Sequence, residues 1–79
     1  MTNKEKYDDI FMESFDLKKN QLNSELKYQS ITEWDSVGHM TMIAGIETEF
    51  DLTLDIDDIT AFSSYEEGFK ILERYEIEF

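Results

Sequence analysis

The sequence predicts an all-α fold, a small four-helix bundle with a long first loop and a short third helix. Two observations support this fold class. The 79 residues suffice for one domain, residues 1–79, with a single core. Apolar residues recur at steps of three and four in several separate segments, which is the spacing of one helical face. The chain has no Pro, so its organisation is read from this periodicity and from the polar breaks.

The first helix is predicted from about Asn3 to Leu17. Its apolar stripe contains Tyr7, Ile10, Phe11 and Phe15, and its charged side contains Lys4, Glu5, Asp8, Asp9 and Glu13. From Lys18 to Asp35 the period is lost, which predicts a loop longer than most connections. We expect its apolar residues to hold this loop against the core: Leu22, Leu26, Tyr28, Ile31 and Trp34.

The second helix is predicted from Ser36 to about Phe50 and is the best periodic segment. Its apolar positions are Val37, Met40, Ile43, Ala44, Ile46 and Phe50. Ser36 stands where the period begins, so its hydroxyl is expected either to cap the helix or to serve as an attachment point. A phosphodiester on that oxygen would lie beside unpaired N–H groups at the positive end of the helix dipole.

Two further helices are predicted after a short connection. The third is short, from Ile56 to Phe62, with Ile59 and Phe62 facing inward, and Ser63 and Ser64 end it. The last begins near Tyr65 with two acidic residues in its first turn, where negative charge suits the helix dipole. We expect it to bury Tyr65, Phe69 and Leu72.

Composition restricts the classes of partner and compartment. Nineteen acidic residues against seven basic ones give a net charge of -12. Nucleic acid is therefore not an expected partner, and basic protein surfaces are. Cys is absent, which fits a reducing cytoplasm. Neither a signal peptide nor an apolar run long enough for a membrane span is present, so we expect a cytoplasmic monomer.

The sequence does not contain the residues from which a catalytic site or a metal site would be predicted. The chain has one His, His39, and no Cys, so it offers no set of nucleophile, base and orienting group. A lone His without a second ligand at suitable spacing is not a metal site, and the acidic run from Asp51 to Asp58 lacks the Gly and the spaced Glu of an EF-hand loop. Trp34 is interpreted as a loop anchor rather than a binding platform.

Several motifs together match one known family over nearly the whole chain. They are Asp35-Ser36-Val37 at a helix start, Met40, Ile43 and Ile46 as an inward stripe, the acidic end Glu47-Thr48-Glu49-Phe50-Asp51, then Leu54, Asp57-Asp58-Ile59 and the Ser63-Ser64 break. With these motifs the sequence resembles an acyl carrier protein. Trp34 and Val37 stand where carriers of fatty-acid synthesis commonly have Gly and Leu, so the chain looks more like stand-alone carriers of specialised pathways.

The resemblance implies that Ser36 carries a 4'-phosphopantetheine arm, which holds acyl groups as thioesters. It implies two kinds of partner: a phosphopantetheinyl transferase, and enzymes with basic surfaces that transfer or modify the acyl group. Positions that such partners touch in the family correspond to Asp35, Val37, Met40, Ala44 and Glu47. A peptidyl or D-alanyl carrier stays open as an alternative. So does an unmodified acidic helical interaction module in which Ser36 is only a cap.

Overall fold

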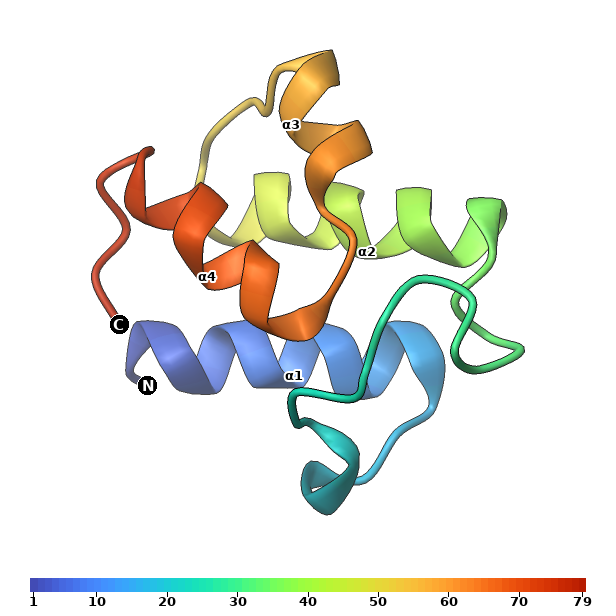
Figure 1. The fold of residues 1–79 in the computed structure, drawn as a ribbon. Helices are drawn as coiled ribbons and strands as arrows, with labels where there is room; N and C mark the ends of the chain where they lie inside the picture. Colours follow the sequence, from blue (N-terminus) through green and yellow to red (C-terminus); the bar gives the residue numbers. More distant parts are fainter.

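A computed structural model describes all residues, 1–79, and shows four α-helices around one core (Figure 1). They are α1 (Asn3–Phe15), α2 (Ser36–Glu49), α3 (Ile56–Ala61) and α4 (Tyr65–Glu73), with a short 3-10 helix, η1 (Lys19–Gln21), in the first connection. The predicted all-α class and the four helices are confirmed. None of the helices is both long and apolar enough to span a bilayer.

The helices α1 and α2 pack along each other and run in opposite directions (Figure 1). The helix α4 closes the core against α1, because the rings of Tyr65 and Phe69 lie 5.4 Å and 4.5 Å from the ring of Tyr7. The two ends of the chain lie side by side, and Asn3 Nδ2 donates a hydrogen bond to the carbonyl oxygen of Glu78 at 3.0 Å.

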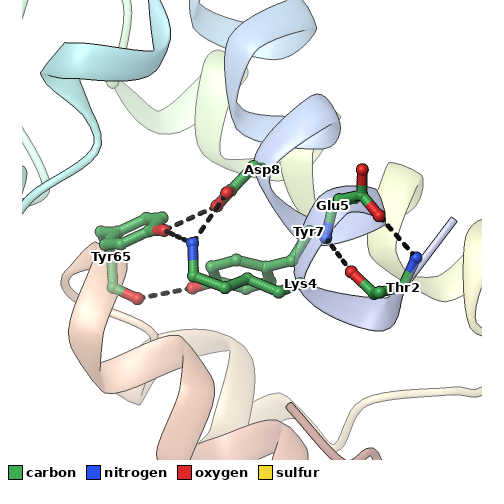
Figure 2. Close-up of polar contacts among 6 residues, drawn as sticks. All are labelled: Thr2, Lys4, Glu5, Tyr7, Asp8 and Tyr65. Atoms are coloured by element: carbon green, nitrogen blue, oxygen red, sulfur yellow. Dashed lines mark hydrogen bonds and ion pairs between the residues drawn. The ribbon is translucent and has the colours of Figure 1, made fainter.

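Local hydrogen bonds define both ends of α1. The Thr2 hydroxyl accepts from the Glu5 N–H at 3.1 Å, and the Glu5 carboxylate accepts from the Thr2 N–H at 2.9 Å, a reciprocal capping box (Figure 2). Asp16 adopts the left-handed conformation (φ 53°) and its N–H donates to the carbonyl of Met12. The helix therefore ends at Phe15, two residues before the predicted end at Leu17.

The aromatic stripe of α1 forms the centre of the core, as predicted. Tyr7, Phe11 and Phe15 are fully buried. The indole of Trp34 stacks on Phe15 at 5.0 Å and meets Phe11 edge-on at 5.5 Å. Trp34 is itself fully buried, which confirms its role as the anchor of the long loop. Ile10, the remaining member of the predicted stripe, is half-buried.

The prediction that Asp8 lies on the solvent side of α1 is wrong, because its carboxylate takes part in a polar network at the interface with α4. Tyr65 Oη donates to Asp8 Oδ1 at 2.6 Å, and Lys4 Nζ contacts Asp8 Oδ2 at 2.9 Å (Figure 2). Tyr7 Oη donates to the carbonyl of Tyr65 at 2.6 Å. Burial, and then the hydrogen bond to Asp8, raise the pKa of Tyr65 to about 12. These bonds satisfy the carboxylate that folding removes from water.

The long loop is held against the junction of α3 and α4 by two backbone hydrogen bonds. The Tyr28 N–H donates to the Ser63 carbonyl, and the Tyr65 N–H donates to the Leu26 carbonyl, both at 2.9 Å. Leu26 is buried as predicted, whereas Tyr28 is 38% exposed and does not anchor the loop in the core. Its backbone is already fixed by the bond to Ser63, and its ring lies on the surface. The loop leads directly into α2, so these two hydrogen bonds also hold the start of α2 close to the segment that follows α3.

A second polar network joins α3 to the end of α4. Arg74 Nη2 donates to Asp58 Oδ1, and Tyr75 Oη donates to Asp58 Oδ2, both at 2.6 Å. Tyr75 Oη also accepts from the N–H of Asp55 at 3.0 Å. The hydrogen bonds from Tyr75 and Arg74 lower the pKa of Asp58 from its ordinary value of 3.8.

This network is expected to make part of the stability depend on acid pH. The folded pKa of Asp58 lies below the unfolded one, so its contribution is fully present above pH 3.8 and is lost as the pH falls through the folded value. The difference in unfolding free energy between the wild type and Asp58→Asn should therefore shrink from about pH 5 to about pH 2, measured by urea titration. The exposed neighbour Asp57, changed to Asn, is the control. A difference for Asp58→Asn that stays constant with pH would contradict the assignment.

Candidate functional site

Ser36 is the first residue of α2, and its side chain is exposed. The expectation that it caps the helix is wrong, because Asp35 is the N-cap and its Oδ1 accepts from the N–H of Gly38 at 2.8 Å. Asp and Ser are both favoured N-caps, and here the residue with the extended backbone takes the role. The hydroxyl of Ser36 has no hydrogen-bond partner in the protein, so it is free to react with an external group.

The long loop fixes the position of this helix start. Directly before it, Trp34 is buried in the aromatic core. A Cβ at Gly38 would collide with the carbonyl oxygen of Glu33 and would lie 3.2 Å from Phe15 Cε1. The loop backbone therefore lies directly against the first turn of α2, an approach that only Gly allows. Ser36 is held at the surface by a rigid, well-packed segment.

A surface recess with a volume of ≈ 270 Å³ opens beside Ser36. Apolar side chains form most of its lining, and hydroxyl groups stand among them. The lining residues are Tyr28, Ser36, His39, Met40, Ile59, Thr60, Phe62 and Ser63. They come from the long loop, from α2, and from α3 with the segment that follows it. Of these residues, the sequence singled out only Ser36 and Met40 as site residues. The other six were missed, because no local sequence pattern shows that three distant segments come together.

His39 links the three segments that surround the recess. Its Nδ1 accepts a hydrogen bond from Trp34 Nε1 at 2.9 Å, since an indole N–H can only donate. Its Nε2 must then carry the hydrogen in the neutral ring, and it lies 2.9 Å from the carbonyl oxygen of Ile59. Both nitrogen atoms are therefore occupied. His39 is thus a half-buried packing residue whose ring nitrogens both have partners within the protein.

The predicted partner-contacting residues divide into two groups. Val37, Met40 and Ala44 are exposed on α2, Val37 by 75% and Met40 by 51%. Met40 was also expected on the inward stripe together with Ile43 and Ile46, and that expectation is wrong because its side chain is exposed. Because α2 is apolar on most sides, periodicity did not distinguish this face from the buried one, which contains Met42, Ile43 and Ile46. The exposed residues form an uncharged face next to Ser36.

The other two predicted contacts are acidic residues with structural roles. Asp35 caps α2, as described above, and is exposed. Glu47 is half-buried, and its Oε2 accepts from the N–H of Leu54 at 2.9 Å, which fixes the connection between α2 and α3. One carboxylate oxygen of each residue therefore already has a partner within the protein.

Charge is distributed unevenly along the chain. No Lys or Arg lies between Lys27 and Lys70, whereas ten Asp and Glu residues do. This stretch contains α2, α3 and the whole surroundings of Ser36. Among the carboxylates of this stretch up to the end of α3, Asp58 alone pairs with a basic side chain, that of Arg74, so the negative charge that remains favours the approach of a positively charged surface. This asymmetry is readable from the sequence alone.

The chain was compared with protein-family models, with curated proteins and with solved structures, and no match was found in any of the three comparisons.

Proposed function

We propose that this protein is a carrier that holds acyl intermediates as thioesters on a 4'-phosphopantetheine arm attached to Ser36, and that it presents them to partner enzymes. The observation that supports the proposal most directly is the free, exposed hydroxyl of Ser36 at the first position of α2, on the rim of an apolar recess. A carrier needs this combination of an accessible attachment atom and a rigid protein scaffold beneath it.

The residues around Ser36 fit a phosphodiester and the chain that follows it. The N–H groups of Ser36 and Val37 have no acceptor in the protein, and they lie at the positive end of the α2 dipole, where an anion is stabilised. The recess beside them offers apolar contacts at Met40 and Ile59 and a hydroxyl at Ser63. When attached, the arm supplies a thiol on which an acyl group is activated as a thioester.

Attachment requires a second protein, a phosphopantetheinyl transferase. The oxygen of Ser36 attacks the pyrophosphate of coenzyme A and forms a new O–P bond. The bond to the leaving group breaks, adenosine 3',5'-bisphosphate is released, and the hydroxyl proton passes to a base of the transferase. His39 does not supply that base, since both its nitrogen atoms are hydrogen-bonded. In this proposal the protein is a substrate and carrier, and it is not an enzyme.

The chemistry of the partners follows from the surface around Ser36. A matching partner has an apolar centre that meets Val37, Met40 and Ala44, and basic residues around it that meet Asp35 and the other carboxylates nearby. Attraction between these charges chiefly raises the association rate, and apolar contact contributes affinity at close range. The transferase and the enzymes that transfer or modify the acyl group share this requirement.

Mass spectrometry tests the proposal. Incubation with coenzyme A, Mg²⁺ and a broad-specificity phosphopantetheinyl transferase should add the mass of one arm, and Ser36→Ala should abolish the addition. Because Asp35 is the cap, Ser36→Ala should change the unfolding free energy by no more than about 0.5 kcal/mol. Ser63→Ala, which removes another exposed hydroxyl at the same recess, is the matched control and should be modified normally.

Two results would count against a carrier. If several transferases leave the wild type unmodified, the remaining candidate is an acidic helical module that binds basic partners without a covalent arm. If Ser36→Ala is still modified, the attachment site is a different residue. Acyl, peptidyl and D-alanyl carriers share the attachment step, and the cargo found on the protein from its native cell would distinguish them.

A further inference from the structure

The four methionines of the chain differ widely in exposure. Met1 and Met40 are exposed, Met12 is half-buried, and Met42 is fully buried. Cys is absent, so these four thioethers are the only sulfur atoms that the chain offers to an oxidant. The oxidation of a sulfur-containing side chain follows its exposure. Met40 is therefore the methionine on the helices that a peroxide in solution reaches most easily.

Met40 lies directly beside the attachment atom. It is four positions after Ser36 on α2, and side chains at this spacing share one face of a helix. A helical side chain leans towards the N-terminus of its helix and covers the preceding turn, which here contains Ser36. Both residues also line the same surface recess. A chemical change at the Met40 sulfur therefore takes place next to the Ser36 hydroxyl.

Oxidation has different consequences at Met40 and at Met42. It converts a flexible apolar side chain into a polar one, which disrupts a packed core. Met42 lies on the buried side of α2 with Ile43 and Ile46, so a peroxide reaches it only when the fold opens. At Met40 the new oxygen is in contact with water, and the core is left intact. The same reaction thus alters the surface at one position and the fold at the other.

Resting on the carrier function proposed above, we propose that Met40 is a site of reversible oxidation that controls the loading of Ser36. Hydrogen peroxide transfers one oxygen atom to the sulfur: the O–O bond breaks, an S–O bond forms, the sulfur loses two electrons, and the peroxide is reduced to water. The uncharged face of Val37, Met40 and Ala44 then carries a strong hydrogen-bond acceptor. A transferase with an apolar centre must bury this oxygen without a donor, which lowers kcat/KM for arm attachment by about ten-fold.

The experiment uses the full chain before any arm is attached. Hydrogen peroxide is added, and peptide mass spectrometry gives the oxidation rate of each methionine. Met40 should be oxidised several-fold faster than Met42, because only the first is exposed. In protein oxidised at Met40 and not at Met42, kcat/KM of the transferase should fall about ten-fold, and the midpoint of urea unfolding should stay unchanged.

Reduction of the sulfoxide should reverse the effect. Methionine sulfoxide reductases for both sulfoxide epimers are supplied with a dithiol. The dithiol is oxidised to a disulfide, the sulfoxide oxygen leaves as water, and the thioether returns. Both the mass of the protein and the rate of arm attachment should then return to those of untreated protein.

Two variants of Met40 test the role of the thioether. Met40→Leu keeps an apolar side chain of similar volume that cannot be oxidised, so its arm attachment should be normal before and after peroxide. Because Met1 is still oxidised in this variant, it also controls for any effect of Met1. Met40→Gln places a polar group at the same exposed position and should be loaded slowly without peroxide. Both variants should unfold at the midpoint of the wild type, since the side chain lies outside the core.

The outcomes separate this inference from the function on which it rests. If no transferase attaches an arm to untreated protein, the carrier function fails, and the control of loading with it. If untreated protein is loaded and protein oxidised at Met40 is loaded equally fast, the control by oxidation alone is wrong. It is also wrong if Met42 is oxidised as fast as Met40, or if peroxide slows the loading of Met40→Leu as much as that of the wild type.

Discussion

Replacing Gly68 with Ala is expected to destabilise the fold by about 3 kcal/mol, although Ala is the better helix former. Gly68 lies in α4, buried against the aromatic centre of the core. An added Cβ would overlap Tyr7 Oη and the ring of Phe62, whose Cε1 would be 2.6 Å away. Tyr7 cannot yield freely, because its hydroxyl donates to the carbonyl of Tyr65 at 2.6 Å. The methyl group thus forces either the rings or α4 to shift, and it endangers a buried hydrogen bond.

Gly45 in α2 provides the matched control. The same substitution there brings the new Cβ to 3.2 Å from Cγ2 of Ile10, a half-buried side chain that can yield by a few tenths of an ångström. Gly45→Ala should therefore lie between neutral and about 1 kcal/mol more stable. Urea unfolding followed by circular dichroism measures both variants. Equal effects at the two positions would mean that helix propensity rather than packing decides them.

The elements that could be predicted are those with one apolar face. In α1, Tyr7, Phe11 and Phe15 recur at four-residue steps, and the sequence predicted both the helix and its buried side correctly. The end of α1 was less predictable, since the periodicity does not indicate at which polar residue the backbone ceases to be helical. The left-handed conformation of Asp16 decides this, and it stops the helix at Phe15.

Predictions based on side-chain type failed where a tertiary contact changed the environment of a residue. Asp8 is buried because Tyr65, 57 residues away, supplies a hydrogen bond to it. Met40 is 51% exposed although it is apolar, because other residues of α2 face α1. In both cases the sequence shows whether the side chain is charged or apolar, but it does not show the environment in which that side chain lies. The partner of Asp8 lies on α4, and the exposure of Met40 depends on which side of α2 packs against α1, so both required the packing of the helices to be known.

In the candidate site, the position of Ser36 at a helix start could be predicted, and its surroundings could not. Ser36 is recognisable because a period begins there, but Asp35 and Ser36 are both good N-caps, and a shift of one residue between them leaves the pattern unchanged. The recess required the loop, α2 and the end of α3 to be brought together. The hydrogen bonds of His39 to Trp34 and Ile59 join these segments, and they span five and twenty residues of sequence.

Replacing Trp34 with Ala is expected to have the largest effect on stability, a loss of about 4 kcal/mol. The indole is fully buried against Phe15 and Phe11, so its removal leaves a cavity at the point where the long loop joins α2. It also removes the donor that faces Nδ1 of His39. A loss of this size approaches the whole stability of a small domain, roughly 5 kcal/mol at the lower end. Because Trp34 is the one Trp in the chain, unfolding is followed by far-ultraviolet circular dichroism.

Two further variants separate the contributions of the indole. Trp34→Phe keeps an aromatic ring but loses the N–H, and it should cost less than half as much as Trp34→Ala, since the half-buried His39 can bind water instead. Tyr28→Ala, which removes a partly exposed ring from the same loop, should cost about 1 kcal/mol. If Trp34→Ala cost no more than Tyr28→Ala, the loop would be held by its backbone bonds to Ser63 and Tyr65 alone. In that event Ser36 would owe its fixed position to the capping of α2 by Asp35 and not to the aromatic core.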